Sequence, residues 1–217
     1  MRVLGISGSL RRDSHNTELL RAAADLLPPG SELELWDDLK AVPPYDADDD
    51  FGLMERPEAL RSLDAAIRDA DVVLFSTPEY NHSIPGVLKN ALDWISRPLA
   101  QSPLRGKPVA VVGASTGMFG AVWAQAELRK VLSAIGARVV DRELPVGLAS
   151  DAFTEDGRLA DHDLELALAD LLAELAGELP GLTGVGDVYE VPEAPDLEIG
   201  GAEPIPAAAA RILAELR

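Results

Sequence analysis

Hydroxyl, amide and guanidinium side chains gather in one short segment near the start of the chain. The apolar residues 3–6 (VLGI) are followed by residues 7–17 (SGSLRRDSHNT). Glycine lets backbone N–H groups approach an anion closely, and hydroxyls and arginines add donors. The amphipathic pattern that follows predicts a helix, whose N-terminus supplies unpaired N–H groups and a positive dipole end. The segment is therefore predicted to bind a phosphate monoester.

Two familiar phosphate motifs fit this segment poorly. It is neither G-x-x-x-x-G-K-[ST], which binds Mg-nucleotides, nor G-x-G-x-x-G, which opens dinucleotide-binding folds. The plain alternative is a serine-rich turn that only caps a strand-to-helix junction.

A second unusual segment is residues 77–94 (TPEYNHSIPGVLKNALDW). Pro78 and Pro85 stiffen its backbone, so its N–H and C=O groups can present a fixed edge to a planar heterocycle, and Tyr80 can pack on such a ring. The alternative is a rigid turn that caps the next helix, with Ser83 as N-cap and Pro85 near the first helical position. Both roles are compatible.

Apolar runs alternate with helical patterns along the chain. Strands are predicted at residues 2–7, 33–36, 71–76, 108–113 and 138–140, and helices at 17–27, 56–69, 84–96, 119–135 and 162–177. Such alternation predicts the α/β class, with a flavodoxin-like, doubly wound, five-stranded parallel sheet and helices on both faces. The loops after the first, third and fourth strands then meet at the carboxyl edge of the sheet.

Composition narrows the class of protein. The 217 residues include no cysteine, which excludes disulfides and thiol chemistry and favours a cytoplasmic location. The net charge of −18 disfavours nucleic acid as a partner. The uncharged span 108–126 is interrupted by glycines, so no membrane segment is predicted. Residues 1–179 are predicted to form the domain, and the Pro-, Gly- and acid-rich residues 180–217 an extension with a short terminal helix over 207–217.

Two motifs carry a resemblance to a known family. Gly8–Asn16 matches G-S-L-R-x-x-S-x-N, and Pro78–Trp94 matches P-E-Y-N-x-S-x-P-G-x-L-K-N-A-x-D-W. Over residues 2 to about 177 the chain resembles the NAD(P)H-dependent FMN reductases of the flavodoxin-like superfamily, a group that includes quinone, azo-dye and chromate reductases.

The resemblance implies a set of FMN-binding residues. Residues of the first loop would hold the FMN phosphate, those after the third strand would line the isoalloxazine, largely through backbone groups, and a third loop, residues 114–120, would complete the site. The set comprises Ser7, Ser9, Leu10, Arg11, Ser14, Asn16, Thr17, Pro78, Glu79, Tyr80, Asn81, Ser115, Thr116, Gly117 and Met118. Ala121 stands where many relatives have glycine.

The activity implied is an FMN-dependent NAD(P)H oxidoreductase. Hydride would pass from NAD(P)H to bound FMN and then to a quinone, free flavin, azo compound or metal oxyanion in a ping-pong cycle. No catalytic side chain and no metal are implied; backbone N–H groups of Gly117 and Met118 would stabilise negative charge on the reduced cofactor. The alternatives are a flavodoxin-like single-electron carrier and, ranked last, a non-catalytic flavin-binding module.

The implied partners are a small-molecule electron acceptor and a second copy of the chain, in a homodimer or homotetramer. The helix at 84–96, with Leu88, Leu92 and Trp94, is a candidate for the subunit contact, and its alternative role is to cover the sheet. His15 and His82 are expected to face solvent or make simple hydrogen bonds, and His162 is expected to mark the start of the last helix.

Overall fold

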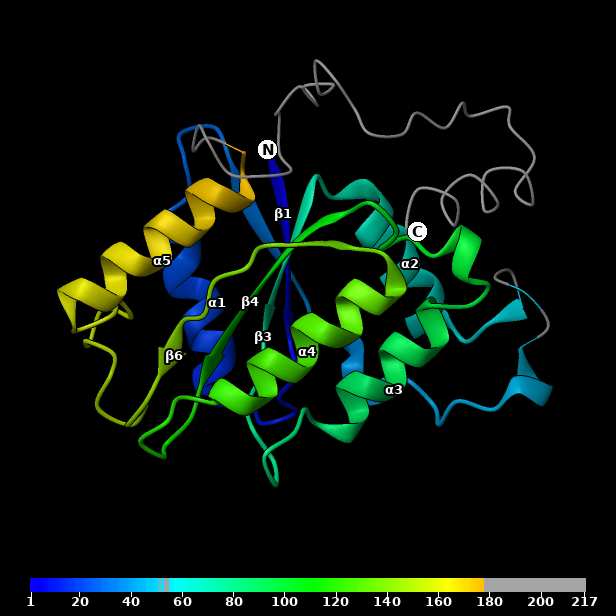
Figure 1. Cartoon of the computed structure of the whole chain (residues 1–217), viewed down its shortest axis with the longest axis horizontal. Coiled ribbons are helices and arrows are strands. Elements are labelled where there is room, and N and C mark those ends of the chain that lie inside the picture. Colours follow the sequence, from blue (N-terminus) through cyan, green and yellow to red (C-terminus); the bar gives the residue numbers. More distant parts are fainter. Residues whose placement is uncertain (51, 53–54, 178–217) are drawn as a thin grey trace, which may run out of the picture. The chain divides into compact units, whose positions relative to one another are not determined.

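The computed structural model describes residues 1–50, 52 and 55–177. In this part of the chain the strands are β1 (Arg2–Ser7), β2 (Glu32–Trp36), β3 (Val72–Ser76), β4 (Pro108–Ala114), β5 (Arg138–Val139) and β6 (Pro145–Val146). The α-helices are α1 (His15–Asp25), α2 (Glu58–Asp69), α3 (Gly86–Ile95), α4 (Val122–Ile135) and α5 (His162–Leu175), and the short 3₁₀ helices are η1 (Asp38–Ala41), η2 (Ala47–Asp49) and η4 (Leu99–Gln101). Strands and helices alternate as predicted (Figure 1).

The strands form one parallel sheet in the order β2-β1-β3-β4-β5, with the direction of winding reversing beside β1. This is the predicted flavodoxin-like order. Ser7 lies beside Ser76, so the carboxyl ends of β1 and β3 are level. The short strand β6, which pairs with the end of β4, was not predicted. It has two residues and begins with Pro145, so it carries neither the length nor the pattern of a strand.

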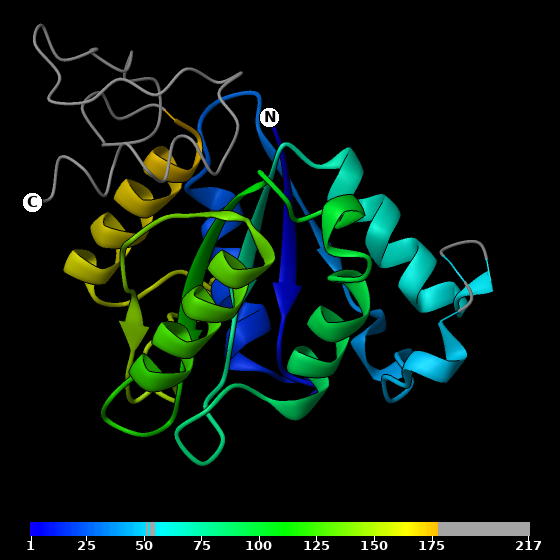
Figure 2. The ribbon, with the colours of Figure 1, turned by 45° about the vertical axis from the view of Figure 1, so that its right-hand side comes forward.

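Both faces of the sheet are covered by helices, because alternate side chains of each strand point to opposite faces. Ile6, Phe75 and Val111 pack with α2, α3 and α4 on one face. Val3, Leu74 and Val112 pack with α1 and α5 on the other. The described helices therefore divide as three and two over the sheet (Figure 2).

The helix α3 belongs to the core of its own chain. Leu88, Leu92 and Trp94 are each 1% exposed, and the Trp94 indole donates to the backbone oxygen of Pro43. The expectation that these three residues form a subunit contact is therefore wrong, because they are already covered within the chain. The acidic segment before α2 contains η2 and docks on α3 through Pro43, whose backbone oxygen accepts from Asn90 Nδ2.

Three helices, α2, α3 and α4, begin two or three residues later than predicted. The helix α4 begins at Val122 rather than at residue 119, because Gly120 and Ala121 have positive φ angles of 55° and 61°. The residue that precedes α3 is Pro85, so Ser83 is not its N-cap.

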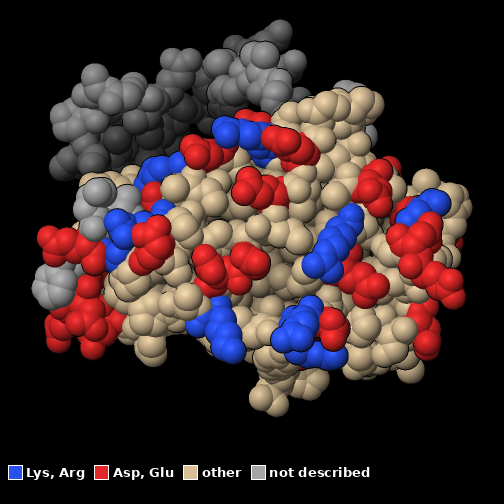
Figure 3. All heavy atoms as spheres, turned by 180° about the vertical axis from the view of Figure 1, so that it is seen from behind, with Lys and Arg blue, Asp and Glu red and all other residues tan. Residues whose placement is uncertain are grey.

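On the face shown in Figure 3, Lys and Arg side chains are interspersed with Asp and Glu. Within residues 1–50, 52 and 55–177, no helix has both the length and the hydropathy that crossing a bilayer requires. The predicted extension 180–217 lies outside the described residues.

Candidate functional site

The loops that follow β1, β3 and β4 leave the sheet at the same edge, at the bottom of Figure 2. The amide of Gly8 donates to the backbone oxygen of Ser76 at 2.8 Å, which joins the first loop to the end of β3. The amide of Thr77 donates to the backbone oxygen of Val112 at 3.0 Å, which joins the second loop to β4. The three predicted binding segments are thus brought together.

The first loop presents hydroxyl groups whose hydrogens remain available. Ser7 Oγ accepts from the amide of Ser9 at 3.3 Å, and Ser9 Oγ accepts from the amide of Arg11 at 3.3 Å. Ser14 is the N-cap of α1, and its Oγ accepts from the amide of Asn16 at 3.2 Å. Because each oxygen serves as an acceptor, each O–H can donate to an anion. Arg11 is exposed beside them.

Asn16 lies beneath this loop and ties three segments together. Its side chain is 3% exposed. Its Nδ2 donates to the backbone oxygen of Ala114 at 2.9 Å, and its Oδ1 accepts from the Ala114 amide at 3.0 Å and the Ser76 hydroxyl at 2.9 Å. Only one Nδ2 hydrogen remains for a direct phosphate contact, so the main effect of Asn16 is to fix α1 against the ends of β3 and β4.

The second loop is a tight turn. Asn81 and His82 have φ angles of 54° and 62°, and Tyr80 and Ser83 exchange backbone hydrogen bonds of 3.0 and 3.2 Å. Two consecutive left-handed residues between paired residues are typical of a type I′ turn. The turn leaves the Tyr80 side chain 50% exposed at the site.

The Glu79 side chain reaches the N-terminus of α4. Its Oε2 lies 3.1 Å from the backbone nitrogens of both Trp123 and Ala124. Its other oxygen, Oε1, lies 3.5 Å from Nδ1 of His82. The carboxylate therefore links the second loop to the helix that follows the third.

Because β4 ends at Ala114 and α4 begins at Val122, the third loop comprises residues 115–121 rather than 114–120. It is held by close backbone contacts with β6 and with Gly147, the residue after β6. A Cβ on Gly147 would lie 2.4 Å from the Met118 oxygen, and one on Gly120 would lie 2.4 Å from the carbonyl carbon of Pro145. The fully buried Gln125 donates to the backbone oxygen of Gly120 at 2.9 Å. The Gly117 amide donates to Ser115 Oγ at 3.1 Å.

Apolar side chains surround the three loops. The exposed ones are Leu10, Tyr80, Met118, Phe119, Trp123 and Leu148, and Met118 is the most exposed of them at 76%. The rings of Phe119 and Trp123 pack 5.1 Å apart, and His82 meets Trp123 edge-on at 4.8 Å. This arrangement provides apolar surface for a planar ring beside a polar cradle.

The histidines make simple contacts. His15 lies 3.3 Å from Glu18, and its ring stacks on Phe153 with centroids 6.2 Å apart. His162 lies at the start of α5, 3.7 Å from Glu165, and is exposed. His15 thus makes the simple hydrogen bond expected of it, and His162 is the first residue of α5, as predicted.

Three residues that position the loops were not predicted from the sequence: Ser76, Gln125 and Gly147. Ser76 ends a hydrophobic strand, Gln125 sits in an amphipathic helix, and Gly147 follows a two-residue strand. A buried glutamine at an apolar position of a helix was the one usable signal, since such a side chain must find internal partners.

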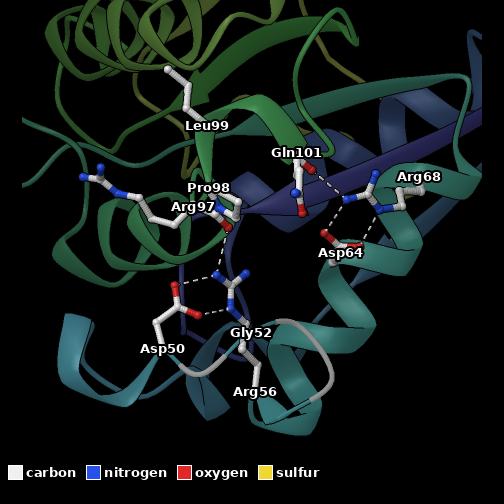
Figure 4. Close-up of a pocket in the computed structure, with 9 residues that line it drawn as sticks. All are labelled: Asp50, Gly52, Arg56, Asp64, Arg68, Arg97, Pro98, Leu99 and Gln101. Carbon is white, nitrogen blue, oxygen red and sulfur yellow. Dashed lines mark hydrogen bonds and ion pairs between the residues drawn. The ribbon is translucent and has the colours of Figure 1, made fainter.

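A cavity of about 650 Å³ lies elsewhere, between α2 and the segment that follows α3 (Figure 4). Arg56, which is 5% exposed, donates to both Asp50 oxygens at 2.9 and 2.7 Å and to the backbone oxygen of Arg97 at 2.9 Å. Arg68 similarly joins Asp64 to the backbone oxygen of Gln101. These arginines already have carboxylate partners, and they join α2 and the segment just before it to the segment after α3.

The Asp50–Arg56 pair predicts an acid-sensitive contribution to stability. The hydrogen bond from Arg56 is the largest cause that lowers the pKa of Asp50, and burial opposes it. Because the folded pKa lies below the unfolded value of about 3.9, the contribution is complete above about pH 5 and is lost as the pH falls through the folded pKa. Urea unfolding should show Asp50→Asn less stable than wild type at neutral pH, with a smaller difference at pH 3. A difference that does not change with pH would contradict this.

Comparisons with known proteins agree with the geometry. The family model for NADPH-dependent FMN reductase matches residues 1–151. The chain is 45% identical over 162 residues to the NAD(P)H-dependent FMN reductase of Pseudomonas aeruginosa. This alignment covers 74% of this chain and 85% of that protein. It is 47% identical over 133 residues to a 2-hydroxy-1,4-benzoquinone reductase from a Burkholderia species, covering 60% of this chain and 69% of that protein.

A solved structure shows the same relationship. FerB, a flavoenzyme NAD(P)H:(acceptor) oxidoreductase from Paracoccus denitrificans, superposes with a TM-score of 0.70 at 33% identity and covers 82% of this chain and 98% of its own. The match of sequence, fold and loop arrangement leads to one conclusion. This chain belongs to the NADPH-dependent FMN reductase family.

Proposed function

We propose that the loops after β1, β3 and β4 bind one FMN, and that the protein uses it to transfer hydride from NAD(P)H to a small-molecule acceptor such as a quinone. The observation that carries the proposal is the junction of the three loops at Asn16 and Glu79. Family membership supplies the cofactor and the co-substrate.

The donor set of the first loop fits the phosphate of FMN. Hydroxyls from Ser7, Ser9 and Ser14 have hydrogens to donate, and the N-terminus of α1 adds backbone N–H groups. Leu10, Arg11 and Thr17 complete the proposed cradle, and Arg11 supplies charge to balance a dianion in a chain of net charge −18.

The second and third loops would hold the ring system. Pro78, Tyr80 and Asn81 would present backbone edges, while Ser115 and Thr116 would approach from the other loop. The Gly117 amide already donates to Ser115 Oγ. The Met118 amide is therefore our preferred donor to the negative charge that would develop on the reduced flavin.

When bound, FMN would supply the hydride chemistry that links NAD(P)H to the acceptor. The protein contributes binding, orientation and preorganised amide dipoles. His82 and Tyr80 are exposed, and in this proposal they would border the space for both substrates. No side chain of the site is assigned a proton-transfer role.

The quinone acceptor is proposed from the names of the relatives, which include a 2-hydroxy-1,4-benzoquinone reductase and quinone reductases.

We also propose a cytoplasmic homodimer or homotetramer, with residues 1–179 as the flavin-binding domain and 180–217 as an extension. Exposed Met118 and Phe119 offer apolar surface that a second copy can cover. Light scattering at micromolar concentration tests this, and a clean monomer would contradict it.

The activity is tested with purified, FMN-loaded protein under anaerobic conditions. NADH or NADPH should bleach the flavin absorbance, and a quinone should restore it with repeated turnover. Negligible NAD(P)H oxidation together with a stable one-electron-reduced flavin would instead support a single-electron carrier. Bound FMN that shows neither property would support a non-catalytic module.

Arg11 provides a test of the phosphate assignment. Arg11→Ala should weaken FMN binding by about 1.5–3 kcal/mol, because a charge-assisted hydrogen bond is lost. The measurement is FMN fluorescence quenching, with the exposed Arg105→Ala as the control. Equal FMN affinity in Arg11→Ala and wild type would contradict the assignment.

A further inference from the structure

The helix α4 lacks a capping side chain of its own. Its N-cap is Ala121, a left-handed residue with φ 61° and no side-chain oxygen. The first N–H groups of a helix have no partner within it, and a neighbouring residue usually supplies one. Here the acceptor comes from another loop, because Glu79 Oε2 receives both the Trp123 and the Ala124 amides at 3.1 Å.

The carboxylate is well placed for this role. The Glu79 side chain is 13% exposed, and its second oxygen lies 3.5 Å from His82 Nδ1. A negative group at a helix N-terminus also interacts favourably with the helix dipole. The His82 ring in turn packs edge-on against Trp123 at 4.8 Å, so the turn and the first turn of α4 are joined at two places.

We propose that Glu79 is a positioning residue for the flavin site: its carboxylate fixes the second loop against α4, and thereby fixes the distance between the second and third loops. This inference rests on the proposed function, since both loops are assigned to FMN. Without the cap, the two loops sample other arrangements, and FMN binding must select the competent one. The apparent affinity then falls with the population of that arrangement.

The test compares three substitutions at Glu79 with a matched control. Glu79→Ala removes the cap, Glu79→Asp shortens the reach, and Glu79→Gln keeps an oxygen that can accept from both amides. The control is Asp161→Ala, which removes the carboxylate that caps α5 by accepting from Asp163 and Leu164. Both alanine variants lose a helix cap, but only one of those caps joins the proposed flavin loops.

Two readouts are needed. Hydrogen exchange of the Trp123 and Ala124 amides in flavin-free protein reports the cap itself, and FMN titration reports its effect on the site. We expect faster exchange and about tenfold weaker FMN binding for Glu79→Ala, an intermediate result for Glu79→Asp, and near wild-type values for Glu79→Gln. Asp161→Ala should leave FMN affinity unchanged.

The remaining outcomes overturn the inference. FMN affinity within twofold of wild type in Glu79→Ala would show that the cap is only structural. Equal losses in Glu79→Gln and Glu79→Ala would show that the charge acts, not the position of the loop. If wild-type protein does not bind FMN at all, the proposed function fails, and the exchange measurement still shows separately whether Glu79 caps α4.

Discussion

Asn16→Leu is expected to lower the free energy of unfolding by about 3–5 kcal/mol, because it leaves several buried polar groups without partners. The amide and carbonyl of Ala114 and the Ser76 hydroxyl all bond to the Asn16 carboxamide. Leucine has a similar size and offers neither donor nor acceptor. Urea unfolding at neutral pH measures the loss.

Ser76→Ala is the matched comparison for this prediction. It removes one hydrogen bond to Asn16 Oδ1 and leaves both bonds to Ala114 in place, so it should cost only about 0.5–1.5 kcal/mol. If the Asn16→Leu variant were as stable as Ser76→Ala, the carboxamide would not be the main connection between α1 and the strand ends.

Gly120→Ala is expected to cost about 3–5 kcal/mol and to displace the third loop. Gly120 has a positive φ of 55°, and an added Cβ would lie 2.4 Å from the carbonyl carbon of Pro145 and 2.6 Å from the nitrogen of Val146. These contacts are with backbone, which cannot rotate away as a flexible side chain can. Unfolding measurements should be combined with FMN titration, since a displaced loop should also weaken binding.

Gly86→Ala is the control for this substitution. Gly86 is the first residue of α3, its added Cβ would meet nothing within 4 Å, and its φ is not positive. Alanine should be neutral or stabilising there by up to about 1 kcal/mol. Equal stability of Gly120→Ala and wild type would contradict the close approach between the third loop and β6.

Much of the fold could be predicted because its signals are local. The buried strands β1, β3 and β4 are continuous apolar runs, and the amphipathic helices between them indicate a parallel sheet. The placement of the loops followed from topology, since parallel strands in adjacent positions end at one edge. The order of strands places β1 next to β3, which is why two motifs about 70 residues apart in sequence meet.

The connections within the site were harder to predict because they join distant residues. The sequence indicated a polar role for Asn16 but not that its carboxamide is used by Ala114, 98 residues away. Likewise, Glu79 was expected to act through its backbone, and nothing local shows that its side chain caps α4. The strand β6 and the role of Gly147 were not predicted for the same reason. Both depend on the close approach of two backbone segments, which leaves no periodic pattern in the sequence.

The most direct test of the central claim is a titration of flavin-free protein with FMN and with riboflavin, which lacks the phosphate. In our account the hydroxyls, amides and Arg11 of the first loop bind the phosphate, and the other two loops hold the ring. The quenching of flavin fluorescence should then saturate at one FMN per chain. Riboflavin should then bind at least about tenfold more weakly, because it forgoes at least one charge-assisted hydrogen bond. Equal affinities for the two flavins, or no saturable binding of FMN, would contradict the account.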